Sequence, residues 1–419
     1  MAELPPEIIT IILSKLPVKS LLRFKSVCKH WHSLIKSPNF VKTHLNQTLT
    51  SDCNRHLLVS VKHSSLHSSK LDLDLDLAHN QLSFSKLRHP LKRRQRFNLV
   101  GSCNGVVCIS NISKTELFLF NPLTKSHRKL PCPQIPVTKL HMTVFGFGYD
   151  SKNNDYKVLR IDQGYGKIED SNNKAQVYSL NSNSWRCIKG IPYNLYNGVY
   201  DGVLFNEALH YVVVIHESES LFIATFDLQT EGFSSIDFPN YDDELDSVPL
   251  FILSELGGRL CLLINCRSFE IGFDEIFDSD EYLDEYFDDE YSDELDDRHV
   301  ELWVMEEYGN KESWVKVSSI CKPKIIRSSE FIRPIVYSKD GKRILLQIHK
   351  SRYCWYNLES GNVERITVNG LPNGDFITGT FMGSLVSLED KILSEKQTLP
   401  RKNKKKVVDN FLSAWLLRL

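Results

Sequence analysis

Apolar residues near the start of the chain recur at steps of three and four, which places their side chains on one face of an α-helix. Three short stretches show this spacing and are predicted to be helices: Pro5–Leu16, Val18–Phe24 and Val27–Lys36. In the first stretch the apolar residues are Ile8, Ile9, Ile12, Leu13 and Leu16. Pro17 and Pro38 are expected to end the first and third helices, because proline cannot continue a helix.

Beyond residue 55 the pattern changes to short runs of alternating apolar and polar positions, which is typical of β-strands. One motif returns four times with matching residues at offsets 0, 4, 7 and 10, starting at Phe120, Tyr178, Phe226 and Tyr356. A looser copy starts at Trp303. In each copy an apolar run leads into polar turn residues and a second strand, which predicts a β-hairpin.

The copies return with a period of roughly 50 residues when the acidic stretch Asp274–Asp297 is left out, as propeller blades do. Blades expose apolar faces until a closed ring buries them. We predict about six blades, closed by pairing of strands from residues 56–62 and 378–388. A sandwich of two sheets is the alternative architecture.

The helical stretch is too small to bury all of its large apolar side chains, since units of about 40 residues seldom hold a sufficient core alone. Part of its apolar surface should therefore pack against something else. One interpretation is that it caps the rest of this chain. The other is that it docks in a groove of another protein.

The spacing of residues in this stretch also carries a family resemblance. The residues concerned are Leu4-Pro5, Glu7-Ile8, Ile12-Leu13, Leu16-Pro17-Val18-Lys19-Ser20-Leu21, Arg23-Phe24, Val27-Cys28-Lys29, Trp31, Leu34-Ile35 and Phe40. Together they resemble the F-box, without a gap. The resemblance implies binding of a Skp-type adaptor and, through it, a cullin. The adaptor-binding residues that it implies are Leu4, Pro5, Ile8, Ile12, Leu16, Pro17, Leu21, Leu22, Val27, Cys28, Trp31, Leu34 and Ile35.

The β part carries a second resemblance. Its stretches are Gly101–Cys108, Asn121–Thr124, Gly146–Asp150, Asp155–Val158 and Leu302–Met305. They resemble the F-box-associated domain of plant proteins, which is classed as kelch-like and implies a substrate-receptor module. The expected fold class is therefore α+β and multidomain: a small N-terminal helical F-box followed by an all-β kelch-like propeller.

The expected domain order follows from these stretches. Residues 1–48 form the F-box, residues 49–98 a linker with the first strands, and residues 99–390 the β domain with an acidic insert at 274–297. Residues 391–419 form a basic tail.

Composition narrows the classes of partner and compartment. The net charge of -1 predicts no general affinity for nucleic acid. No apolar run is long enough for a signal peptide or a membrane span, so no membrane partner is expected. The ten cysteines contain no C-x-x-C pair, which favours free thiols in a reducing compartment. We expect the cytoplasm, the nucleus or both; Arg401–Lys406 resembles a nuclear-import signal, and a solvated tail is the alternative.

Motifs for catalysis and for cofactors are absent from the sequence. Gly146-x-Gly148 lacks the third glycine of a dinucleotide loop. The run beginning at Asp72 has Leu77 where a calcium loop needs glycine and Ser83 where it needs glutamate. No nucleophile elbow, zinc motif or phosphate loop occurs. We therefore expect a protein that is not an enzyme and that holds no cofactor or metal.

The acidic insert holds fourteen carboxylates and should stay extended and solvated. One interpretation is a tolerated loop expansion. The other is an arm that docks a basic target, with steering by Asp280, Glu281, Asp284, Glu285, Asp288, Asp289 and Glu290. A basic cluster precedes the first repeat, at Lys86, Arg88, Lys92, Arg93, Arg94 and Arg96, and could pair with the insert.

The resemblances imply the substrate-recognition subunit of a Skp–cullin–F-box ubiquitin ligase, which binds a protein target through its β domain for ubiquitination and degradation. The alternative is a nuclear scaffold or regulatory binding protein that recruits no ligase. The chain is also similar to pollen S-locus F-box proteins, whose targets are pistil ribonucleases. A pistil ribonuclease is therefore one candidate target, although the sequence does not name the substrate.

Overall fold

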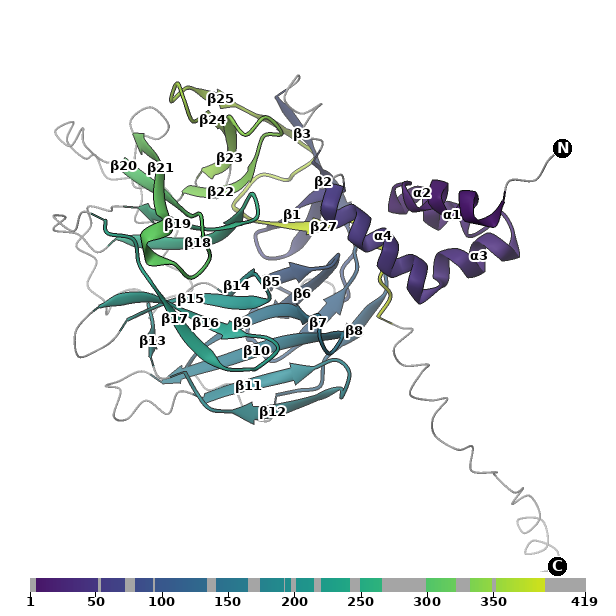
Figure 1. Cartoon of the computed structure of the whole chain (residues 1–419), viewed down its shortest axis with the longest axis horizontal. Helices are drawn as coiled ribbons and strands as arrows, with labels where there is room; N and C mark the ends of the chain where they lie inside the picture. The colour runs from purple at the N-terminus through teal and green to yellow at the C-terminus, as the bar shows by residue number, and fades with distance from the viewer. Residues whose placement is uncertain are drawn as a thin grey trace, which may run out of the picture.

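The N-terminal part of the chain folds into four helices: α1 (Pro6–Ser14), α2 (Val18–Phe24), α3 (Lys29–Lys36) and α4 (Pro38–Ser51). They lie at one side of a ring of β-sheets in the computed structural model (Figure 1). The structure describes residues 5–51, 54–71, 80–92, 95–133, 141–164, 174–191, 193–196, 201–214, 220–241, 249–265, 299–321, 332–348 and 352–388.

The three predicted helices are confirmed, and α4 was not predicted. Pro38 follows the end of α3, as expected, but it is also the first residue of α4. Proline is accepted there because the first turn of a helix does not use its N–H group. Cys28 is the N-cap residue that precedes α3. Its Sγ accepts a hydrogen bond from the backbone N of Trp31 at 3.4 Å, at a position where serine or aspartate is usual.

Six sheets form the blades of a closed ring, and we number them from the first strand of the chain. Blade 1 contains β1 (Arg55–Val61), β2 (Ser65–Lys70), β4 (Ser85–Leu87) and β27 (Phe376–Met382). Blade 2 contains β5 (Phe97–Cys103), β6 (Val106–Asn111), β7 (Leu117–Phe120) and β8 (His127–Lys129). Blade 3 contains β9 (His141–Asp150), β10 (Asp155–Gly164), β11 (Lys174–Ser179) and β12 (Ser184–Ile188).

The second half of the ring follows the same plan. Blade 4 contains β13 (Asn194–Leu195), β14 (Val203–Phe205), β15 (Ala208–Val214), β16 (Leu221–Asp227) and β17 (Phe233–Asp237). Blade 5 contains β18 (Leu250–Leu256), β19 (Arg259–Asn265), β20 (His299–Met305) and β21 (Trp314–Cys321), with the short 3-10 helix η1 (Lys311–Ser313) before β21. Blade 6 contains β22 (Ile332–Tyr337), β23 (Arg343–Ile348), β24 (Arg352–Asn357) and β25 (Val363–Arg365).

Two pairings join the end of the chain to its beginning. β27 pairs antiparallel with β1, from Arg55 opposite Met382 to Val61 opposite Phe376. β3 (Gln81–Ser83) also pairs in parallel with β26 (Thr367–Asn369). The predicted six-bladed propeller is thus confirmed, and the sandwich alternative is wrong. Blade 1 draws strands from both ends of the β region, so the propeller begins at β1.

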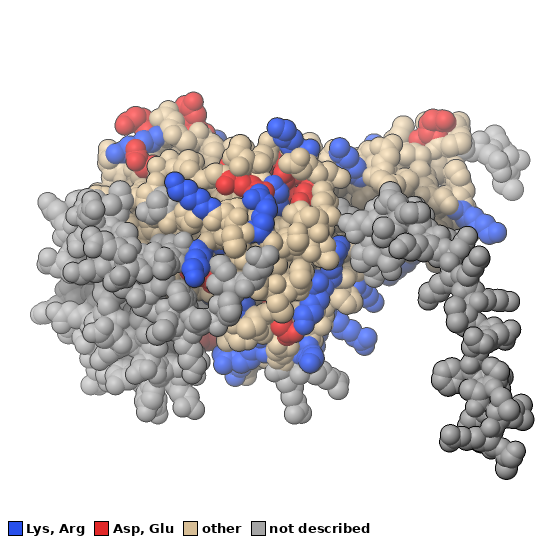
Figure 2. All heavy atoms as spheres, turned by 90° about the horizontal axis from the view of Figure 1, so that it is seen from below, with Lys and Arg blue, Asp and Glu red and all other residues tan. Residues whose placement is uncertain are grey.

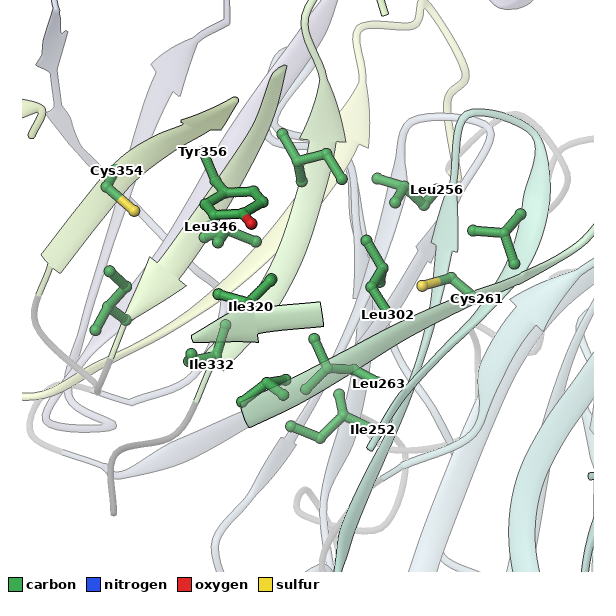
Figure 3. Packing of buried hydrophobic residues seen from close by; sticks show 14 residues of the cluster. Ile252, Leu256, Cys261, Leu263, Leu302, Ile320, Ile332, Leu346, Cys354 and Tyr356 are labelled. Atoms are coloured by element: carbon green, nitrogen blue, oxygen red, sulfur yellow. The ribbon is translucent and has the colours of Figure 1, made fainter. Parts of the chain in front are cut away.

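The hydrophobic cores lie between the blades. Each of six clusters draws buried residues from two neighbouring blades, which closes the ring by packing as well as by hydrogen bonds. Figure 3 shows the cluster between blades 5 and 6, which includes Leu263, Leu302, Leu346 and Tyr356. Because each blade completes two cores, a missing blade would expose two apolar surfaces to water.

The repeated motif forms the hairpin between the last two strands of four blades. Offset 0 pairs with offset 7 in every copy: Phe120 with His127, Tyr178 with Trp185, Phe226 with Phe233 and Tyr356 with Val363. The residue at offset 5 always has a positive φ: Lys125, Asn183, Glu231 and Gly361. In three copies the carboxylate or amide oxygen at offset 1 accepts hydrogen bonds from the two turn N–H groups that follow, at Asn121, Asp227 and Asn357. The polar turn residues therefore fix the hairpins.

A short C-terminal segment, Gly383–Leu388, connects the helical unit to the propeller. Leu385 is buried in the core of the helical unit with Leu13, Leu21 and Ile35. Leu388 is buried in the cluster between blades 2 and 3. One segment thus belongs to both cores and holds the helical unit against the ring.

Candidate protein-docking surfaces

Helix α1 has two apolar faces. Ile9 and Leu13 lie four residues apart and pack into the core of the helical unit. Ile8, Ile11 and Ile12 lie on another face, where 43%, 52% and 47% of each residue is exposed. Three exposed isoleucines on one short helix form an apolar surface that nothing in the described chain covers.

A fourth exposed apolar side chain belongs to the same unit. Val27, between α2 and α3, is 60% exposed, the largest value among the exposed large apolar residues described. A depression of about 500 Å³ lies beside it, lined by Lys25, Ser26, Cys28, Lys29, His32 and Ser33. The loop before α3 therefore presents an apolar side chain next to a shallow hollow.

The residues predicted to bind an adaptor differ in their exposure to solvent. Pro5, Ile8, Ile12, Pro17, Val27 and Cys28 are exposed, and Leu16, Leu22, Trp31 and Leu34 are partly buried. Leu21 and Ile35 are fully buried in the helical core, so they offer no surface and act through the fold of the unit. Leu4 lies outside the described residues. Prediction from the sequence missed Ile11, although its position three residues after Ile8 placed it on that face.

Four cysteine thiols among the described residues are held in their neutral form by burial. Desolvation raises the pKa of the Cys103, Cys261 and Cys354 thiols to about 12, and burial raises that of Cys108 well above its usual value. Such thiols are poor nucleophiles, because the thiolate is the reactive form. Among the described residues there is no cluster of three metal-ligating side chains and no helix long and apolar enough to cross a membrane.

The second predicted surface belongs to the acidic insert. Asp280, Glu281, Asp284, Glu285, Asp288, Asp289 and Glu290, proposed to dock a basic target, lie outside the described residues, as do Arg93, Arg94 and Arg401–Lys406. The described ends of the acidic connection are Asn265 of β19 and His299 of β20, so the insert leaves the ring from blade 5.

The comparisons match both parts of the chain. Residues 1–43 match the family model of the F-box domain, and residues 57–388 match that of the F-box associated beta propeller domain. F-box protein CPR1 of Arabidopsis thaliana is 32% identical over 89% of this chain and 86% of its own length. F-box protein At4g22390 of the same plant is 29% identical over 92% of this chain and 90% of its own length.

A helical unit with an uncovered apolar face, held against a closed propeller, is the architecture of a protein built to join two partners. The chain belongs to the F-box proteins that carry an F-box associated β-propeller domain. An F-box implies binding of a Skp-type adaptor and, through it, a cullin. Both domains and the relatives support a substrate-recognition role in a Skp–cullin–F-box ligase.

Proposed function

We propose that this chain is the non-catalytic receptor subunit of a Skp–cullin–F-box ubiquitin ligase. The adaptor binds the exposed isoleucines of α1, Ile8, Ile11 and Ile12, and also contacts the exposed Val27 of the loop before α3. The propeller holds a target protein for ubiquitination and degradation. The observation that carries the proposal is the uncovered apolar face of α1 on a unit fixed to the ring. Covering the exposed parts of these four side chains would contribute on the order of 4 kcal/mol.

The proposed contribution to catalysis is proximity alone. A receptor raises the local concentration of target lysines near the ubiquitin-loaded enzyme, which turns a bimolecular encounter into an intramolecular one. Segment Gly383–Leu388 supports this role, because it fixes the direction of the helical unit relative to the propeller. A loosely tethered receptor would present its target over a wide range of positions.

The finer assignments are proposals as well. Residues 280–290 would steer a basic target by their charge, and a tolerated insertion remains the alternative for this segment. Action in the cytoplasm, the nucleus or both is proposed from the sequence. The target itself is open, and a pistil ribonuclease is one candidate.

The test is affinity purification of the tagged full chain from plant cells treated with a proteasome inhibitor. The wild type should recover a Skp-type adaptor and a cullin, together with ubiquitinated proteins. The double variant Ile8→Asp/Ile12→Asp should recover neither adaptor nor cullin, because unpaired charges cannot be buried at an interface. A variant that recovers both as well as the wild type does would instead favour a scaffold or regulatory protein that recruits no ligase.

A further inference from the structure

The rim of blades 1 and 2 carries a concentration of positive charge that the assigned role does not use. Between residues 80 and 133 the described residues include one carboxylate, Glu116. The described basic residues of the same range are Lys86, Arg88, Lys92, Arg96, Lys114, Lys125, Arg128 and Lys129. This imbalance is local, because the whole chain has a net charge of -1.

Contacts show that part of this charge is gathered around Glu116. Lys129 forms an ion pair with its carboxylate, and Gln95 donates a hydrogen bond to it at 2.9 Å. The pKa of Glu116 is lowered, chiefly by the hydrogen bonds from Lys129 and Gln95, which outweigh the opposing effect of burial. The positive charges of Lys129 and Lys92 lower it further. The backbone N of Ile112 bonds to the carbonyl of Arg96 at 3.2 Å, which holds the segment before β5 against the β6–β7 loop. One carboxylate therefore serves several cations.

The pKa values of two neighbouring histidines are consistent with this excess of positive charge on blade 1. The pKa of His67 and that of His89 are lowered by burial and then by the positive charge of Lys86. Figure 2 shows that Lys and Arg side chains predominate over carboxylates on much of the described part of the face seen from below. We define the rim surface as Lys86, Arg88, Lys92, Arg96, Arg128 and Lys129.

The same chain contains a segment of matching opposite charge. Residues 274–297 hold fourteen carboxylates and no lysine or arginine. In a blade of four antiparallel strands, the second-to-third connection and the connection to the next blade lie on one face of the ring. The insert joins β19 to β20, the second and third strands of blade 5, and residues 88–96 join blades 1 and 2, so both start from the same face.

Reach and tethering favour this partner. Blade 5 lies across the ring from blade 2. Half of the connection between Asn265 and His299, when extended, reaches about 50 Å, which is similar to the width of a domain of this size, whose radius of gyration is roughly 20 Å. A tether of this kind gives an effective concentration on the order of millimolar. A free acidic protein would need a high affinity to compete.

We propose that the rim surface on blades 1 and 2 binds the chain's own acidic segment, residues 274–297, in the same molecule. The contact is electrostatic, between carboxylates and the cations of the rim surface, all of which are exposed except the partly buried Arg128. It is therefore weak per residue and depends on ionic strength. A basic target of the kind proposed above would compete with the rim surface for the segment. The contact does not depend on adaptor binding.

The experiment measures binding of a synthetic peptide of residues 274–297 to two forms of the purified protein, the full chain and the chain with that segment deleted. We expect the peptide to bind the deletion form, with affinity falling about tenfold or more as salt is raised from about 50 to about 500 mM. The full chain should bind the peptide about tenfold more weakly, because its own segment occupies the surface. No binding, or equal binding to both forms, would overturn the proposal.

Charge reversal locates the surface. Lys86→Glu/Lys92→Glu/Arg96→Glu, made in the deletion form, should abolish peptide binding. The matched control on blade 6 is Lys342→Glu/Arg352→Glu/Arg365→Glu, whose residues are also exposed, and it should bind as the deletion form does. Thermal melting checks that both triple variants fold. Equal loss in the two triple variants would contradict the assigned surface.

Two further measurements exclude other occupants. Sedimentation of the full chain should show a monomer. A dimer that dissociates when residues 274–297 are deleted would mean that the segment occupies the rim surface of a second copy, and it would overturn the intramolecular assignment.

A single-stranded oligonucleotide of equal charge should bind the deletion form no more tightly than the peptide does. Tighter binding would point to nucleic acid and overturn the proposal.

Discussion

The buried side-chain amide of Asn121 donates a hydrogen bond at 3.0 Å to the backbone carbonyl of Ser384, which lies 263 residues further along the chain. The same nitrogen donates to the carbonyl of Val386 at 2.9 Å. Its oxygen accepts from the backbone N–H groups of Leu123 and Thr124, which shapes the β7–β8 turn. One side chain thus forms a hairpin turn and fixes the segment that reaches the helical unit.

Replacing Asn121 by alanine should destabilise the protein more than the matching change in blade 6. Asn121→Ala removes the turn contacts and the donor to the buried carbonyl of Ser384, and it leaves the partly buried carbonyl of Val386 with only the Thr124 hydroxyl at 3.3 Å. The expected cost is about 3 kcal/mol. Asn357→Ala removes a turn of the same design and should cost about 1 kcal/mol. Urea denaturation monitored by fluorescence measures both. Equal losses would mean that the contacts to Ser384 and Val386 add nothing.

Truncated chains should show that the closing strand β27 is needed for stability and that the residues after Leu388 are not. A chain that ends at Leu388 keeps β27 and its pairing with β1, and it should melt at the same temperature as the full chain. A chain that ends at Asp375 lacks the innermost strand of blade 1 and exposes the clusters that contain Phe376 and Phe381. It should be insoluble or rapidly digested by protease. A soluble, cooperatively melting product would contradict closure by β27.

Equivalent hairpin positions should differ in energy according to burial. Trp185 is 4% exposed, and its Nε1 donates to the carbonyl of Pro131 at 2.8 Å, whereas Phe233 is partly exposed. Trp185→Ala should cost roughly 3–5 kcal/mol. Phe233→Ala should cost about 2 kcal/mol because less surface leaves the core. Melting temperatures of the two variants test this, and an unchanged melting temperature for Trp185→Ala would refute the role of this position in the blade core.

Two buried histidines should make the protein less stable in mild acid. Burial lowers the pKa of His210 to about 4; burial, followed by the charges of Lys19 and Lys70, lowers that of His56 to about 4. The folded state therefore keeps both rings neutral, and their contribution is complete above pH 6.5, the ordinary pKa, and lost as pH falls toward 4. Each should remove about 2 kcal/mol by pH 5. Between pH 7.5 and pH 5, His210→Gln should lose about 2 kcal/mol less than the wild type; an equal loss would argue against a neutral His210.

The sequence predicts the elements whose signals are local. Three helices follow from the spacing of apolar residues, and four hairpins follow from turn residues at fixed offsets. The end of α1 and the whole of α4 could not be read in the same way, since a proline between helical patterns can either stop a helix or start one. The sequence analysis also treated the two apolar faces of α1 as a single face. A short helix rich in isoleucine has too few polar residues to show that Ile9 faces the core while Ile8 and Ile11 face outward.

Long-range relationships were harder to predict. The closing pair of strands was found because both ends of the β region carried strand patterns without partners. The contact of Asn121 with Ser384 gave no sequence signal, because an asparagine at a turn is explained by the turn alone. Likewise, Leu21 and Ile35 match the F-box pattern because they build the core of the helical unit. The sequence alone does not distinguish such core residues from residues that contact the adaptor.

The central claim is that the exposed face of α1 binds a Skp-type adaptor, and calorimetric titration of the purified adaptor into the full chain tests it most directly. Ile12→Asp should weaken binding about a hundredfold or more, since a charge left unpaired at an interface costs several kcal/mol. The matched control is Val315→Asp on the outer strand of blade 5, because Ile12 and Val315 are each 47% exposed. We predict tight binding by the wild type and by Val315→Asp, and binding weaker by about a hundredfold or more by Ile12→Asp. Equal affinity for all three proteins, or no binding by the folded wild type, would contradict the account.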